Sequence, residues 1–170
     1  MIWVAGVAGT CFPITDGIEA ASEGKPLTTV RTKTEGFVTK PFMKWSHLQQ
    51  LLDADWQIGA HTATHCKVAD KHAAEGDNGV LQEIQTSNEL FRKHLGLSPE
   101  HFAYPSGSHN DRTDELLASH YQSLRLWHFE WPIHWTFTDS NTSPLAVDIQ
   151  NIDLRVPFDD FKRIFIEAME

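Results

Sequence analysis

The chain of 170 residues has few cysteines, few basic residues and no long apolar run, and each scarcity excludes a class of protein. Cys11 and Cys66, its two cysteines, form neither a Cys-x-x-Cys pair nor the dense framework of a disulfide-stapled domain. Fourteen Lys and Arg against 23 Asp and Glu give a formal net charge of −9, which argues against nucleic acid as a partner. No stretch approaches the roughly 20 apolar residues of a membrane span, and the N-terminus lacks the pattern of a secretion signal. We therefore expect no membrane span, and the localisation stays open.

What the chain does contain is an alternation of apolar, strand-like runs and amphipathic, helix-like runs, typical of an α/β fold. We treat residues 1–170 as one domain, because 41% hydrophobic content is enough for one core. Strands are expected over residues 7–14, 56–60, 101–105, 121–127 and 147–156. Helices are expected after Ser46, from Asp77 or Asn78 to Gly96, over 111–120 and from about Asp159. Asp16-Gly17 is interpreted as a turn, and residues 19–40 receive no firm structure. Periodicity alone leaves a (β/α) barrel and an open doubly wound sheet as alternatives.

The chemically suggestive feature is a pair of histidines, His61 and His65, directly after the apolar run at residues 56–60. If the segment turns into a helix, positions four apart share a face, and both rings reach one divalent ion at about 2.0–2.1 Å. The spacing alone is weak evidence, since ten histidines in 170 residues give about 0.6 such pairs by chance. The alternative is a pair of surface or core histidines without a ligand role.

The sequence around these histidines resembles the polysaccharide deacetylase family, the NodB homology domain of carbohydrate esterase family 4. Residues 57–65 read Gln-Ile-Gly-Ala-His-Thr-Ala-Thr-His, where the family has Glu-Ile-Gly-Ser-His-Thr-x-x-His. Residues 102–107 read Phe-Ala-Tyr-Pro-Ser-Gly and match the family's Phe-Ala-Tyr-Pro-x-Gly. Residues 6–13 are similar to the family's second strand, Gly-Val-Pro-Ala-Thr-Phe-Phe-Val. The likeness therefore extends over most of the chain.

The resemblance implies an irregular, incomplete (β/α) barrel that binds a metal. In it, His61 and His65 are two of three ligands to Zn²⁺ or another divalent ion. Thr62 or Thr64 is implied to help hold the loop between them.

The resemblance also implies a carbohydrate substrate. Tyr104, Pro105 and Ser106 are expected to border the acyl group, with the Ser106 N–H directed at the oxyanion. Trp131 and Trp135 are candidates for stacking on sugar, and the alternative for both is ordinary packing in the core and at its rim.

Some parts of the family pattern have no counterpart in the sequence. The Asp-Asp-Gly block that carries the family's base and third ligand is not found, and neither is the Leu-x-x-His that carries its acid. Asp16-Gly17 lies after the second strand rather than on the first, and other members of the family are expected to carry Arg at the position of Ala103. The catalytic residues are therefore unknown, and a homo-oligomer or an additional chain segment is expected to close the barrel.

Two functions follow from these observations. The first is a metal-dependent hydrolase that removes N-acetyl or O-acetyl groups from a cell-envelope or extracellular polysaccharide. The second is a catalytically inactive carbohydrate-binding or structural domain on the same fold.

Overall fold

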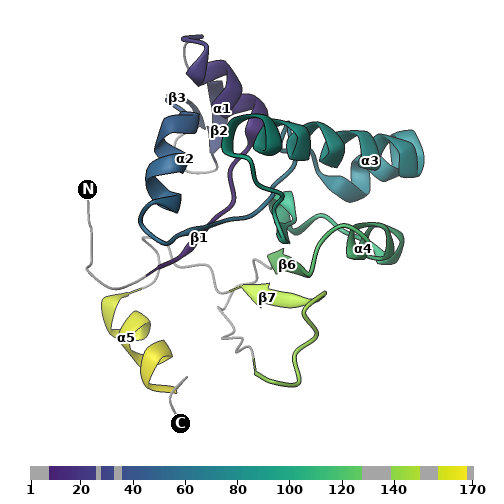
Figure 1. Cartoon of the computed structure of the whole chain (residues 1–170). Coiled ribbons are helices and arrows are strands. Elements are labelled where there is room, and N and C mark those ends of the chain that lie inside the picture. Colours follow the sequence, from purple (N-terminus) through teal and green to yellow (C-terminus); the bar gives the residue numbers. More distant parts are fainter. Residues whose placement is uncertain (1–7, 26–27, 33–35, 128–138, 150–156, 168–170) are drawn as a thin grey trace.

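The computed structural model describes residues 8–25, 28–32, 36–127, 139–149 and 157–167 (Figure 1). Its strands are β1 (Thr10–Cys11), β2 (Thr28–Thr32), β3 (Gly36–Lys40), β4 (Gln57–Ile58), β5 (His101–Ala103), β6 (Ser123–Trp127) and β7 (Val147–Ile149). Its helices are α1 (Thr15–Ser22), α2 (Trp45–Leu52), α3 (Val68–Leu95), α4 (Asp111–Ala118) and α5 (Phe158–Glu167), with a 3₁₀ turn η1 (Pro105–Gly107).

Five strands form an open, parallel array. β1 pairs with β4, and β5, β6 and β7 pair in that order, all in parallel. A parallel bridge between Ala60 and Phe102 joins the two groups, so the order is β1, β4, β5, β6, β7. In the described part of the chain no pairing joins β7 back to β1. The expected α/β fold with an incomplete barrel is confirmed.

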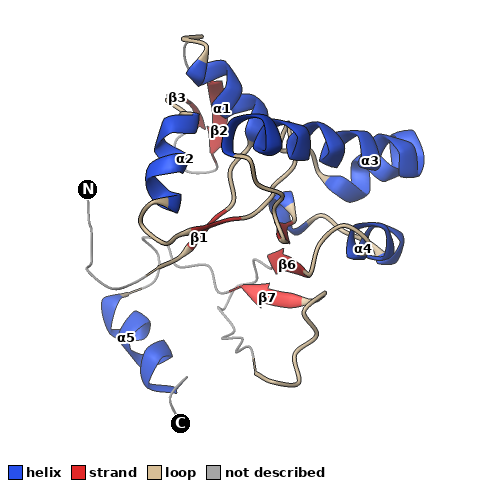
Figure 2. Ribbon diagram, viewed as in Figure 1, coloured by secondary structure: helices blue, strands red, loops and turns tan. Residues whose placement is uncertain are grey.

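The core lies where the helices cover the strands, and Figure 2 shows α1, α2 and α3 together on one side of β1. Leu124 and Leu126 alternate with less buried residues along β6, as expected for a strand with one face against helices. The buried apolar cluster comprises Ile18, Trp45, Leu48, Ile58, Ala60, Val68, Val80, Ile84, Phe91, Phe102, Tyr104, Leu117, Tyr121, Leu124 and Leu126.

The long helix α3 consists of two helical segments joined by a kink at Gly76. The second segment starts where Asp77 or Asn78 was expected to begin a helix. It ends at Gly96, whose φ of 66° is the left-handed conformation that terminates helices. The start of α3 at Val68 lies ahead of the sequence-based prediction.

The largest difference from the sequence-based prediction lies in residues 15–40. The interpretation of Asp16-Gly17 as a turn was wrong, because both residues belong to α1. This helix is stabilised by tertiary contacts: Ile18 is 1% exposed, and Glu19 accepts a hydrogen bond from Trp45 Nε1 at 2.6 Å. Residues 19–40, left without firm structure, also contain the antiparallel pair β2 and β3.

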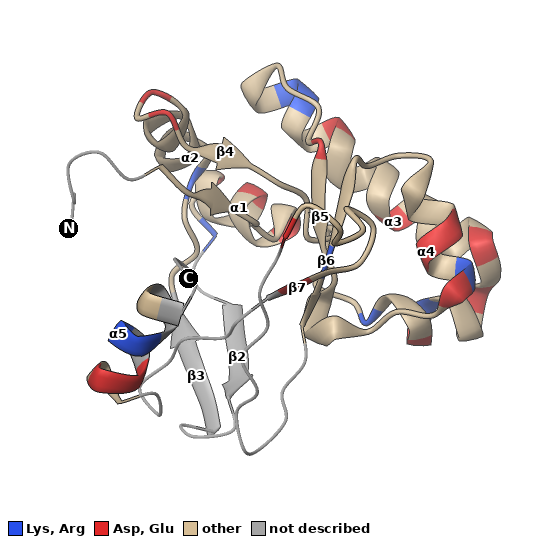
Figure 3. Ribbon diagram, turned by 90° about the horizontal axis from the view of Figure 1, so that it is seen from below, with Lys and Arg blue, Asp and Glu red and all other residues tan. Residues whose placement is uncertain are grey.

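Charge on the described surface is mainly acidic. Figure 3 shows Asp and Glu recurring along α3 and α4, in line with the net charge of −9. None of the helices in the described ranges is both long and apolar enough to cross a membrane.

Candidate metal centre

The two candidate ligands lie in the loop that follows β4, at the carboxyl ends of the parallel strands. The loop is not helical, so the helix-based geometry expected for the pair was wrong. Instead, Thr62 and His65 both adopt the left-handed conformation, with φ of 63°. This folds the loop back on itself and brings the rings of His61 and His65 to a centroid distance of 4.9 Å, with an interplanar angle of 58°.

This spacing fits two ligands of one ion. Two imidazoles whose nitrogens lie about 2.0–2.1 Å from a tetrahedral metal have ring centres about 5 Å apart. His61 Nδ1 lies 2.7 Å from the Ala103 carbonyl oxygen. Because a carbonyl only accepts, Nδ1 carries the proton and Nε2 keeps the free lone pair. In proteins, metal-binding histidines are oriented by such a hydrogen bond from the ring nitrogen that does not bind the metal.

Burial also favours the form of histidine that binds metals. Burial is the main reason that the pKa of His61 falls to about 4; His65 lowers it further, while the hydrogen bond to Ala103 raises it. Burial likewise lowers the pKa of His65. Both rings are therefore neutral at neutral pH, which leaves nitrogen lone pairs available to a cation.

A carboxylate that the sequence analysis did not single out lies behind this loop. Glu83, on α3, is 8% exposed, and its Oε1 accepts hydrogen bonds from the Thr64 N–H at 2.7 Å and the Thr64 hydroxyl at 2.8 Å. The Thr62 hydroxyl oxygen accepts a hydrogen bond from the His65 N–H at 2.9 Å. The sequence did contain a signal, because Glu83 falls on the apolar face of its helix between Val80 and Ile84.

The loop after β5 lies beside the histidines, because the residue that anchors His61 directly precedes Tyr104. Ser106 is exposed and adopts a left-handed φ of 56°, which is uncommon for a residue with a side chain. None of the described residues accepts a hydrogen bond from its N–H. The Tyr104 side chain is 2% exposed and donates to Asp114 Oδ1 at 2.7 Å, so the phenol stabilises the loop from within. Pro105 is buried as well.

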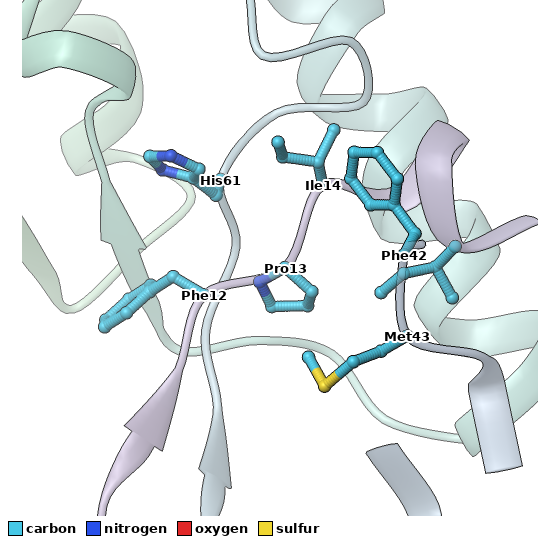
Figure 4. Close-up of a pocket in the computed structure, with 7 residues that line it drawn as sticks. Phe12, Pro13, Ile14, Phe42, Met43 and His61 are labelled. Atoms are coloured by element: carbon cyan, nitrogen blue, oxygen red, sulfur yellow. The ribbon is translucent and has the colours of Figure 1, made fainter. Parts of the chain in front are cut away.

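An apolar pocket of about 310 Å³ adjoins His61. Figure 4 shows His61 at one side, Phe42 and Met43 at the other, and Pro13 between them. Its lining consists of Phe12, Pro13, Ile14, Ile18, Phe42, Met43 and His61. Apart from the imidazole, every lining side chain is apolar, so the pocket suits a nonpolar group beside the two histidines.

The structure does not place the predicted sugar contacts, because Trp131 and Trp135 lie outside the described residues. Within the described ranges no group of three His, Cys, Asp or Glu side chains could hold a metal, so His61 and His65 form an incomplete ligand set there. His109 Nδ1 lies 3.0 Å from Asp114 Oδ2, and its ring lies 5.3 Å from that of Tyr104.

Comparisons with known proteins point to one family. The sequence model described as polysaccharide deacetylase matches residues 4–123. No curated protein sequence matches the chain. A de-N-acetylase from Aggregatibacter actinomycetemcomitans is similar in structure, with a TM-score of 0.67 and 14% identity over 92% of this chain and 64% of that one.

Two further solved structures resemble the chain. A Streptococcus pyogenes deacetylase in complex with acetate has a TM-score of 0.66 and 15% identity, over 96% of this chain and 59% of that one. A deacetylase domain from Bordetella bronchiseptica has a TM-score of 0.63 and 16% identity, over 83% of this chain and 60% of that one. At these identities the likeness shows the fold, and the chain spans less than two thirds of each of the three structures.

Proposed function

The chain belongs to the polysaccharide deacetylase family, and on that premise we propose that it acts as a metal-dependent hydrolase on a cell-envelope or extracellular polysaccharide. The reaction is removal of N-acetyl groups or, as the lesser alternative, O-acetyl groups. One observation carries the proposal: two neutral imidazoles from one loop lie 4.9 Å apart, and a main-chain carbonyl leaves Nε2 of His61 free.

His61 and His65 are proposed as two ligands of Zn²⁺ or another divalent ion. When bound, such an ion would polarise the substrate carbonyl and lower the pKa of a water. The role of this chain's residues is to present two neutral nitrogens in a fixed orientation. The hydrogen bond from His61 to Ala103 and the low pKa of both rings support that role.

The substrate is proposed to lie between the loop after β5 and the apolar pocket. The exposed Ser106 N–H, which no described residue uses, is suited to stabilise an oxyanion. Because Tyr104 and Pro105 are buried, their contribution is to shape this loop. The acyl methyl and the nonpolar face of the adjoining sugar would lie against the pocket next to His61. Trp131 and Trp135 remain proposed sugar contacts.

A non-catalytic carbohydrate-binding domain on the same fold is the second candidate. One observation motivates it: the described residues offer two ligands rather than three. The general base and the general acid have no assignment among the described residues. Both candidate functions allow the chain to bind a glycan, but only the hydrolase would release acetate from it.

Metal content and acetate release, measured on the full chain, test the proposal. Wild type is compared with the double variant His61→Ala/His65→Ala, and His120→Ala serves as control because His120 is an exposed histidine away from the site. We expect wild type and the control to retain Zn²⁺ and to release acetate from acetylated chito-oligosaccharide, and the double variant to lose both properties. Equal metal content in all three proteins would refute the ligand assignment. Metal and glycan binding without acetate release would establish the second candidate.

A further inference from the structure

Glu83 is a nearly buried carboxylate in the middle of a helix, at a position where its neighbours Val80 and Ile84 are core residues. Burying a carboxylate is unfavourable unless hydrogen bonds replace the lost water. Among the described residues Glu83 forms no ion pair with Lys or Arg; Lys71, which pairs with Glu75 at 2.9 Å, feels the charge of Glu83 only as a weaker contribution that raises its pKa. The hydrogen-bond partners of Glu83 are instead the main-chain N–H and the hydroxyl of Thr64. The carboxylate therefore holds the residue that directly precedes His65.

The loop needs such support because of its conformation. Thr62 and His65 both have a φ of 63°, and a β-branched residue at positive φ is an outlier. Conformations of this kind persist only where the surrounding contacts determine them, and they cluster at functional sites. After His61, three sets of hydrogen bonds hold this loop: the His65 N–H to the Thr62 hydroxyl, the Asp16 N–H to the Ala63 carbonyl at 3.1 Å, and the two from Thr64 to Glu83. Among the partners in these hydrogen bonds, Glu83 is the residue that lies on α3.

We propose that Glu83 is a positioning residue: by accepting two hydrogen bonds from Thr64 it holds His65 in the orientation that binds the metal. This inference rests on the proposed function, since it gives His65 a ligand role. Glu83 acts on His65 through Thr64 and touches neither the ion nor the substrate. Its effect depends on acceptor oxygens, so a glutamine in its place can keep the same two hydrogen bonds.

The affinity of the full chain for Zn²⁺ and Co²⁺ distinguishes positioning from simple packing. Removing such a supporting residue typically weakens metal binding by about 10–100-fold, and this loss is expected for Glu83→Ala. Glu83→Gln should restore the affinity to within about 3-fold, and Thr64→Val, which removes the hydroxyl donor, should fall between them. Glu89→Ala, on the exposed face of the same helix, is the matched control and should bind like wild type. The visible spectrum of bound Co²⁺ should change with Glu83→Ala and remain unchanged with Glu89→Ala.

Two results would overturn the proposal. If Glu83→Ala binds both ions as wild type does, His65 needs no help from α3. If Glu83→Gln is as weak as Glu83→Ala, the charge rather than the hydrogen bonds matters. Should Glu83→Ala fail to fold, Glu83→Gln and Thr64→Val still decide between these readings.

Hydrogen exchange of the metal-free chain keeps this proposal separate from the proposed function. Without Glu83 the Thr64 and His65 amides should exchange at least about 10-fold faster, because their protection comes from local contacts. Unchanged exchange at both amides would refute the positioning role whether or not an ion binds. If wild type binds no metal while the amides respond as expected, the metal assignment fails and the hold of Glu83 on the loop stands.

Discussion

Replacing Gly107 by alanine is expected to destabilise the chain through two separable effects. Gly107 has a φ of 63°, and a residue with a side chain in the left-handed region loses about 1–2 kcal/mol. The added Cβ would also lie 2.0 Å from the Trp127 carbonyl oxygen on β6, far inside van der Waals contact. Relief of such an overlap by shifting backbone typically costs about 1–3 kcal/mol. The sum is about 2–5 kcal/mol, a large share of the 5–15 kcal/mol typical of a domain.

Gly96 provides a matched control for this substitution. Its φ of 66° is nearly the same, but nothing lies within 4 Å of the position of its Cβ. Gly96→Ala should therefore show the conformational cost alone, about 1–2 kcal/mol. Urea denaturation followed by fluorescence measures both, and with a slope of about 2 kcal/mol/M the midpoint of Gly107→Ala should fall by roughly 1–2.5 M. Equal midpoints for the two variants would refute the argument that η1 packs this closely against β6.

Three further predictions concern the core. Burial raises the pKa of Tyr121 to about 12 and raises that of Tyr104 further, so absorbance at 295 nm should show no tyrosinate near pH 10 in the folded chain. Folding then favours the protonated phenols, and their contribution to stability is lost as pH rises above about 10; ionisation of folded protein at pH 10 would contradict this. Although burial raises the pKa of Glu19, the hydrogen bonds from Lys93 and Trp45 and the charges of His94 and Lys93 bring it below the ordinary value. Its stabilisation is present above about pH 4.5 and lost as pH falls, so Glu19→Gln should flatten the acid side of the stability profile. Phe102→Ala, at 0% exposure, should cost about 3–5 kcal/mol and lower Tm by about 10 °C, whereas Phe158→Ala, at 69% exposure, should change Tm by less than about 2 °C.

The sequence predicted most of the parallel array because each buried strand is an apolar run with clear breaks. It did not predict α1, whose Asp16-Gly17 pair is typical of a turn. Contacts with distant residues favour the helix there. The Phe42 ring packs so closely on Gly17 that a Cβ would overlap it, and Trp45 donates its backbone N–H to the Ser22 hydroxyl. Contacts of this kind join residues more than twenty positions apart, and no local pattern encodes them.

The candidate site was predictable in its residues but not in its geometry. The spacing and flanking sequence of His61 and His65 predicted that the two rings share an ion. The prediction assumed that a helix brings them together, whereas the segment is a loop. The rings approach because Thr62 and His65 both have positive φ, a conformation that a β-branched residue such as threonine rarely adopts. Glu83 was visible as a charged residue on an apolar helix face, but its partner Thr64 could be identified only in three dimensions.

The anchor of His61 has a consequence for sequence change in this family. The acceptor is the carbonyl oxygen of residue 103, an atom that every amino acid carries in the same place. Exchange of the side chain at that position alters what residue 103 itself can do and leaves the imidazole tautomer of His61 untouched. The orientation of His61 therefore does not depend on which side chain residue 103 carries.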